Sequence, residues 1–337
     1  MNTQKILSLM RPLLLAAVIS SLAAVALGAA GFDSAGQGSF DRTLAVTGAV
    51  ELEVSTGSGN ITIRPGSSRA VHVHGVIKSN NHWLFGGSGN VEAAIRQLES
   101  NPPILQDGNF IRVGRIDDPE LRRHISIDYE IETPSGTQLK ANSGSGDVSV
   151  NGVQGPVKAV TGSGNLKIAD VQNELTATTG SGDIHAESIK GEVHLSTGSG
   201  SVQAEGVGGA FYVSTGSGNV TVQDNNGGSG KVSTGSGDVR LSGVNGSLRV
   251  GTGSGDITAQ GRAAGDWSLH SGSGGLVVRL PSAAGFDIDA HADSGRIITH
   301  RSVSVQGTAR KGTLVGVVGK GGPQLQLRTG SGDIEID

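Results

Sequence analysis

The chain has 337 residues, and 56 of them are glycine, more than double the usual share of about 7%. Hydrophobic residues make up 35% and the formal net charge is only −4, which argues against a disordered chain. The glycines follow no G-X-Y period, which excludes collagen, and interior glycine costs a helix about 1 kcal/mol per position, which disfavours a helical bundle. The chain has no cysteine, so disulfides, thiolate zinc sites and cysteine catalysis are excluded.

The first segment predicts export. Lys5 and Arg11 precede an uncharged run, 12–30, that is rich in leucine and alanine and ends in small residues. This pattern is typical of a signal peptide, here residues 1–30, cut near Gly28 or Ala30. An uncleaved anchor helix is the alternative. No later segment is apolar enough to span a membrane, so we expect a periplasmic, cell-surface or extracellular protein, and its mild acidity argues against a nucleic-acid partner.

Residues 31–143 are predicted to hold the first coil and an irregular N-terminal cap. Within them, residues 90–100 favour an amphipathic helix, with Val91, Ile95 and Leu98 on one face and Asn90 as its N-cap. We expect this segment to cover one end of a repeat array.

A repeat dominates the sequence from residue 144 to residue 337. Ten in-phase copies of the tripeptide G-S-G begin at residues 57, 144, 162, 180, 198, 216, 235, 253, 272 and 330, and from 144 to 272 the steps are 18 or 19 residues. Asp or Asn usually follows, then an apolar–polar–apolar strand such as Val148 to Val150, a short turn, and a second alternating strand such as Leu175 to Ala177. The pattern predicts an all-β fold, a parallel β-solenoid with two strands per coil of about 18 residues, of either handedness. The last 37 residues before Gly330 are expected to form two coils, and the chain is expected to end on a bare repeat strand.

The repeated tripeptide and the residue after it are interpreted as a structural corner. Glycine is expected to supply positive φ, Asp or Asn to bond the nearby backbone, and the preceding Thr to form hydroxyl ladders with the motif serines. The corner residues are Gly144, Gly146, Asp147, Gly162, Gly164, Asn165, Gly180, Gly182, Asp183, Gly235, Gly237, Asp238, Gly253, Gly255 and Asp256.

Metal sites receive weak support from the sequence, and no cofactor is indicated. Most corner acids alternate with neutral residues, but Asp238 and Asp256 lie in adjacent coils and would be the place for an ion such as Ca²⁺. His72 and His74 share the outward face of one strand, yet they lack a third ligand nearby. Solvated positions are therefore the favoured interpretation of both histidines.

Polysaccharide cleavage would need paired carboxylates, or a base together with a charge-stabilising Arg, Lys or metal ion. Asp128, Glu130 and Glu132 alternate along one strand and so share one face, which is expected to be solvated, with Ile127, Tyr129 and Ile131 facing inward. Trp83 and Phe85 are interpreted as packing in the cap, and Trp267 falls in an inward column. The chain contains no nucleophile elbow, phosphate-binding loop or metalloprotease motif.

One outward face is mildly basic. Its candidate binding residues are Lys140, Lys158, His194, Lys231 and Arg249, which fall at equivalent positions of the second strand in five of seven successive coils, with Thr176 and Tyr212 at that position in the other two. Such a face suits an anionic cell-envelope polymer or surface glycan, and a merely solvated face is the alternative.

Three stretches of sequence resemble a known family. They are the repeated TGSGD/N unit, the segment ISIDYEIETPSGTQLKANSGSGDVSV (125–150) and the closing LQLRTGSGDIEI (325–336). They resemble the bacterial putative-adhesin family of β-strand-repeat envelope proteins, a domain of unknown function, over roughly residues 40–337. The resemblance implies a solenoid and brings no functional residues with it.

The sequence therefore favours a non-enzymatic exported scaffold for structure or adhesion. The alternatives are a polysaccharide-active β-helix enzyme and an envelope filament assembled by end-to-end self-association.

Overall fold

The computed structural model describes residues 37–79, 88–223, 228–305 and 311–337. The predicted signal peptide and both Trp83 and Phe85 lie outside these residues. Within the described ranges, no helix is long and apolar enough to cross a membrane.

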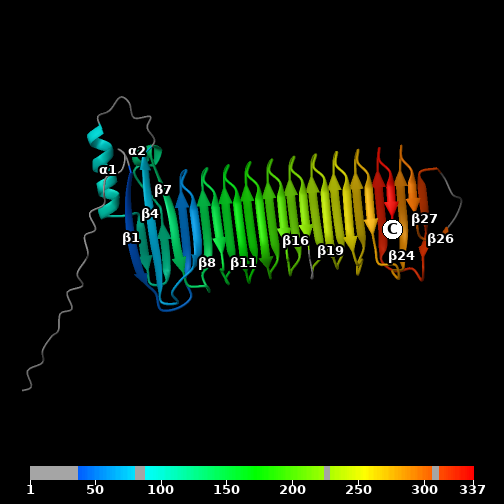
Figure 1. Ribbon diagram of the computed structural model, residues 1–337, viewed down its shortest axis with the longest axis horizontal. Helices are drawn as coiled ribbons and strands as arrows, with labels where there is room; N and C mark the ends of the chain where they lie inside the picture. The colour runs from blue at the N-terminus through cyan, green and yellow to red at the C-terminus, as the bar shows by residue number, and fades with distance from the viewer. Residues whose placement is uncertain (1–36, 80–87, 224–227, 306–310) are drawn as a thin grey trace, which may run out of the picture. The chain divides into compact units, whose positions relative to one another are not determined.

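All 29 strands of the described chain lie in two long sheets (Figure 1). Sheet A has 14 strands in the spatial order β1 (Gln37–Ala45), β4 (Ala70–Ser79), β7 (Ile125–Thr133), β3 (Ile61–Pro65), β9 (Val148–Asn151), β11 (Leu166–Val171), β13 (Ile184–Ile189), β15 (Val202–Glu205), β17 (Val220–Gln223), β19 (Val239–Val244), β21 (Ile257–Gly261), β23 (Leu276–Arg279), β29 (Ile334–Ile336) and β25 (Ile297–Thr299). Sheet B has 15 strands in the order β26 (Val303–Val305), β27 (Thr313–Val318), β24 (Phe286–Ala292), β28 (Gln324–Thr329), β22 (Trp267–Ser271), β20 (Leu248–Thr252), β18 (Gly230–Thr234), β16 (Phe211–Thr215), β14 (Val193–Thr197), β12 (Leu175–Thr179), β10 (Val157–Thr161), β8 (Gln138–Ser143), β2 (Glu51–Thr56), β6 (Phe110–Val113) and β5 (Ile104–Asp107).

Each regular coil contributes one strand to each sheet, and successive coils pair in parallel. Leu166, for example, pairs with Val148 on one side and with Ile184 on the other, one repeat away in each direction. The inward residues of each strand are buried, including Val148, Val150 and the large side chain of Trp267. This confirms the predicted β-solenoid with two strands per coil, because period-two alternation puts every second side chain into the thin interior.

The two terminal coils of the sequence do not lie at the ends of the stack. The coil of β2 and β3 lies between the coil of β8 and β9 and an outer coil made by β6 and β7. At the other end, the coil of β28 and β29 lies between β22–β23 and β24–β25, so the red C-terminal strands in Figure 1 have neighbours on both sides.

This arrangement corrects two expectations. The strand at Ile334–Ile336 is not a bare end, because β25 covers it. The 37 residues before Gly330 do not form two coils, because after β25 the chain makes the antiparallel strands β26 and β27 before it returns to the stack.

Irregular elements lie at the other end of the stack. β4 and β1 extend sheet A with antiparallel strands, and helix α1 (Ser88–Ser100) packs on β1. α1 begins two residues before Asn90, and its Ile95 and Leu98 are buried as predicted. The Glu99 carboxylate accepts a hydrogen bond from the Ser39 N–H of the edge strand, at 3.1 Å. The helix therefore uses an edge donor that would otherwise be free to pair with another chain.

Close approach between coils, and not positive φ, explains the motif glycines. No G-S-G glycine has positive φ; the left-handed residues of the regular coils include Gly152, Asp170, Ser188 and Gly206, in the turn on the opposite side. A Cβ at Gly182 would overlap the carbonyl oxygen of Gly164 in the preceding coil, well inside the 3.0 Å that real Cβ atoms respect. The same overlap with the preceding coil recurs at Gly146, Gly164 and Gly200.

From Ser143 onward, the residue before each G-S-G is buried and bonds backbone, not other hydroxyls. The Thr179 hydroxyl donates to the Gly164 carbonyl at 2.8 Å and accepts from the Gly182 N–H at 3.2 Å. Ser143, Thr161, Thr197, Thr215 and Thr234 repeat this pair of bonds. The expected ladder of hydroxyls is therefore wrong, since each hydroxyl bridges two backbone groups and the motif serines Ser145 and Ser163 are exposed.

The acid or amide after the motif accepts a hydrogen bond from the backbone of the next coil. The Asn165 N–H donates to the Asp147 carboxylate at 2.7 Å, and the Asp183 N–H donates to the Asn165 side-chain oxygen at 2.9 Å. Asp and Asn alternate freely in this column because either side chain supplies the one oxygen that the next coil needs.

We expect Gly182→Ala to lower the free energy of unfolding by about 2–3 kcal/mol, because the added methyl must push two coils apart. Denaturant unfolding measures the change. Ser181→Ala is the matched control, since Ser181 is the exposed middle residue of the same motif. Equal stability of the two variants would contradict a steric role for the glycine.

A cluster of charges holds the inserted N-terminal coil between its neighbours. Glu53 on β2 lies 3.1 Å from Lys140 on β8 and 3.0 Å from Arg112 on β6. The hydrogen bond from Lys140, together with that from Arg112, lowers the pKa of Glu53 from its usual 4.5, although partial burial acts in the opposite direction.

A lowered folded-state pKa stabilises the protein above the unfolded value, and this stabilisation is lost as the pH falls through the folded value. We therefore expect Glu53→Gln to destabilise the protein at neutral pH, and we expect the difference from wild type to shrink as the pH falls below 4.5 and to vanish below the lowered folded-state pKa of Glu53. Unfolding free energies measured across this range check it, with the exposed Glu174→Gln as control. If the difference in unfolding free energy stayed constant at acidic pH, the packing of the Glu53 side chain, and not its charge, would be what stabilises the protein.

Candidate functional site

The five basic residues predicted from the sequence do lie in one row on the outside of sheet B. The parallel register aligns Lys140, Lys158, Thr176, His194, Tyr212, Lys231 and Arg249 on consecutive strands. We call the part from Lys158 to Arg249 the sheet B stripe. Neighbouring strands are about 4.8 Å apart, so the stripe is about 24 Å long.

Two of the five basic residues in this row are paired with carboxylates, which the sequence did not predict. Lys140 lies 2.9 Å from Glu51 and 3.1 Å from Glu53, which neutralise it. His194 lies 2.6 Å from Glu192. Within the described ranges, no carboxylate pairs with Lys158, Lys231 or Arg249, and all three are exposed. The stripe therefore carries cations on both sides of a central pair of rings.

The central rings are His194 and Tyr212. They stack with centroids 4.6 Å apart and planes 6° from parallel, and Tyr212 is 41% exposed. Around them lies a shallow hollow of about 410 Å³, whose lining includes Lys231 and the hydroxyl side chains of Thr176, Thr178, Ser196, Ser214 and Ser233.

Sequence reasoning missed the hydroxyls as site residues, although the repeat contains the signal. Ser196, Ser214 and Ser233 each lie two residues after a member of the stripe, so period two places them on the same outward face. Tyr212 was visible as an outward position, but its stacking on His194 depends on the register between coils.

A second polar surface lies on sheet A near the cap. Antiparallel pairing of β4 with β7 puts His72 opposite Glu132 and His74 opposite Glu130, so two separate candidate groups from the sequence are neighbours. His72 and the carboxylates face outward as predicted, while Ile127, Tyr129 and Ile131 are buried.

Most polar groups of this surface form ion pairs or hydrogen bonds with one another. The Nδ1 atom of His74 lies 2.8 Å from Asp41, and Arg64 lies 2.9 Å from Glu132. Asp128 pairs with Lys78 and also accepts the Asn60 N–H, which continues the column of coil-linking acids. These partners give two of the three carboxylates a structural role between strands.

Asp238 and Asp256, the predicted ion site, belong to the same coil-linking column. The Asp238 carboxylate accepts the Asp256 N–H at 3.1 Å and pairs with Arg240 at 3.1 Å, and Asp256 accepts the Gly275 N–H at 2.7 Å. Each carboxylate thus has one oxygen committed to the neighbouring coil.

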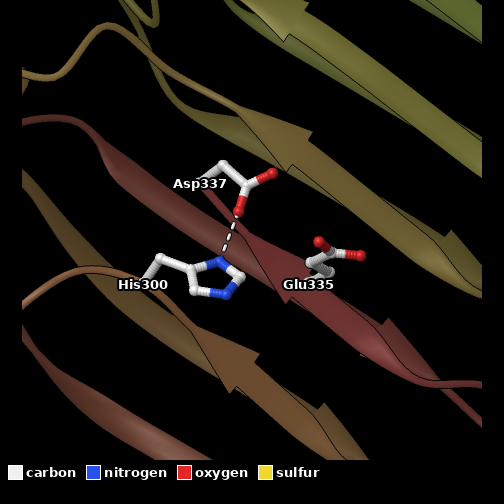
Figure 2. A group of neighbouring side chains, drawn as sticks. All are labelled: His300, Glu335 and Asp337. Atoms are coloured by element: carbon white, nitrogen blue, oxygen red, sulfur yellow. Dashed lines mark hydrogen bonds and ion pairs between the residues drawn. The ribbon is translucent and has the colours of Figure 1, made fainter.

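Another group in the described part of the chain has the geometry of a metal site. The ligand atoms of His300, Glu335 and Asp337 lie within 4.8 Å of one another (Figure 2). An imidazole with two carboxylates is a ligand set for divalent transition metals. However, Asp337 already pairs with His300 at 2.6 Å and with Arg279 at 3.6 Å. The spacing of these residues in the sequence did not predict this group. β25 and β29 pair although the segment between them in the chain is longer than one coil.

The chain resembles solved structures at low sequence identity and matches one family model. No curated protein matches the chain. Solved structures that it resembles include a "putative cell adhesion protein" of Clostridium sporogenes (12% identity, TM-score 0.20) and "putative adhesins" of Parabacteroides distasonis (10%, TM-score 0.34) and Bacteroides fragilis (14%, TM-score 0.29). Each alignment covers 89% of this chain, and 99%, 97% and 97% of the respective structures.

A family model matches the chain twice, over residues 41–207 and 173–337. The two matches overlap and together span the whole solenoid, including both inserted terminal coils. The resemblance seen in the repeated TGSGD/N unit is thereby confirmed, and the chain belongs to the Toastrack DUF4097 family.

Proposed function

We propose that this protein is an exported, non-enzymatic scaffold of the cell envelope or cell surface, and that the sheet B stripe binds an anionic polysaccharide. The observation that carries the proposal is the exposed Tyr212 ring, stacked on His194 in a hollow lined with hydroxyls and Lys231.

Each part of the hollow suits a sugar polymer. An exposed aromatic ring offers a flat apolar surface with a polar hydroxyl at its edge, which fits the apolar face of a sugar ring. Serine and threonine hydroxyls donate and accept hydrogen bonds, as sugar hydroxyls do. Lys231 and Arg249 supply cations for carboxylate, sulfate or phosphate groups of the polymer.

The repeat itself favours a long ligand over a small one. The hollow is shallow and continues into a row of outward side chains from Lys158 to Arg249, with one residue per coil. An extended polymer can contact several coils at once, so weak contacts add up along the chain.

Two further observations support the remaining parts of the proposal. The predicted signal peptide supports export. Asp128 and Glu132, two of the three carboxylates considered for polysaccharide cleavage, are paired with Lys78 and Arg64, which favours a structural use.

We expect the purified protein to bind an anionic polysaccharide such as polygalacturonate in a titration, and to bind a neutral glucan more weakly. Tyr212→Ala should lower the affinity about tenfold because it removes the stacking surface, while Tyr212→Phe should keep most of it. Lys231→Ala should weaken binding and its salt dependence.

Lys167→Ala is the matched control, because Lys167 is an exposed lysine on the outward face of sheet A. Equal effects of Lys231→Ala and Lys167→Ala would show that binding follows total charge and not the stripe. Release of shortened chains from the polymer, abolished by Glu130→Gln, would instead support the enzyme alternative.

A further inference from the structure

The outer N-terminal coil closes its corner in an unusual way. A regular coil crosses this corner in four residues, as in 144–147 between β8 and β9. The outer coil instead uses residues 114–124 between β6 and β7, including the short helix α2 (Pro119–His124). The longer path opens the corner into a hollow of about 360 Å³ between this segment and the turn at Ser55–Gly57.

Arginines and isoleucines line this hollow. Ile116, Ile125 and Ile127 supply apolar surface, and Arg112, Arg115 and Arg122 supply three guanidinium groups. Arg112 lies 3.0 Å from Glu53, and Arg115 lies 2.9 Å from Asp117. Among the described residues, no carboxylate pairs with Arg122, so one positive charge at the hollow is left without a counter-charge.

Tyr129 also lines the hollow and carries an unsatisfied polar atom. Its side chain is 1% exposed, and its hydroxyl has no hydrogen-bond partner among the described residues. Burial raises the pKa of the Tyr129 hydroxyl, so it remains protonated and keeps a hydrogen to donate. An unpaired buried hydroxyl costs a protein about 1–3 kcal/mol, which makes a ligand that accepts this hydrogen a natural partner.

We propose that this hollow binds a small organic anion, with a carboxylate or phosphate group on an apolar body. Arg122 contacts the anionic group, the Tyr129 hydroxyl donates to one of its oxygens, and the three isoleucines contact the apolar body. The guanidinium of Arg122, for which no carboxylate partner is found among the described residues, is the cation that would contact the anionic group. This site is separate from the sheet B stripe and does not depend on polysaccharide binding.

Calorimetric titration and thermal melting of the purified protein with benzoate, phenyl phosphate and inorganic phosphate test the proposal. We expect benzoate, phenyl phosphate or both to bind and raise the Tm, and inorganic phosphate to do so much less, because it has no apolar body. Preference between the two organic anions tells a carboxylate site from a phosphate site. Arg122→Gln should weaken binding about tenfold or more, and Tyr129→Phe about threefold to tenfold.

Two controls separate the site from general effects. Arg69→Gln removes an exposed arginine elsewhere in the cap and should leave binding unchanged. Without ligand, Tyr129→Phe should keep or raise the Tm, because phenylalanine preserves the ring and removes only the unpaired hydroxyl.

The proposal is overturned if neither organic anion binds, or if inorganic phosphate binds as well as they do. It is also overturned if Arg69→Gln and Arg122→Gln weaken binding equally. A lower Tm of Tyr129→Phe without ligand would show that the hydroxyl is already satisfied, and would remove the reason for a ligand.

Discussion

The distance between neighbouring strands at the G-S-G corner constrains the rest of this structure. Parallel coils stack about one strand spacing apart, and at the corner the carbonyl oxygen of one coil occupies the place where the next coil would have a Cβ atom. Glycine is therefore required there in every coil that has this corner, whatever the backbone angles. The buried hydroxyl before the motif completes the corner, because it bonds a carbonyl of the preceding coil and an N–H of its own turn. Without it, two buried backbone groups per coil would lose a partner.

This constraint leaves the outward faces free to vary. Inward positions are held to apolar residues and corner positions to glycine, hydroxyl and Asx residues, but outward positions only have to tolerate water. The sheet B stripe uses that freedom to combine rings, hydroxyls and cations in consecutive coils. The proposed binding face and the architecture thus use different residues, so one can change without the other.

Both ends of the stack cover the edges of their last repeat strands, but they use different elements to do so. A solenoid end exposes two strand edges, and each end here is closed by irregular or antiparallel strands, while the terminal repeat coil lies one position inside. At the N-terminal end the closing segment also produces the hollow around Tyr129, since α2 replaces a tight corner. Edge strands β5 and β26 still expose Leu105 and Val305, the surfaces on which the predicted end-to-end association would have to act.

The sequence by itself determined the coil. Alternation at Val148 and Val150 and the step of 18 residues between motifs specify two strands per coil and their register, because local periodicity and repetition are properties of the chain alone. It also placed the five basic residues in one row, since equal steps imply equal positions. The tertiary structure decided which of them keep their charge, because Glu51 and Glu53 reach Lys140 from an inserted coil far away in sequence. It likewise decided the order of the terminal coils, the pairing of His300 with Asp337 and the burial of the Tyr129 hydroxyl. These features depend on contacts between segments that no repeat relates, so no spacing in the sequence encodes them.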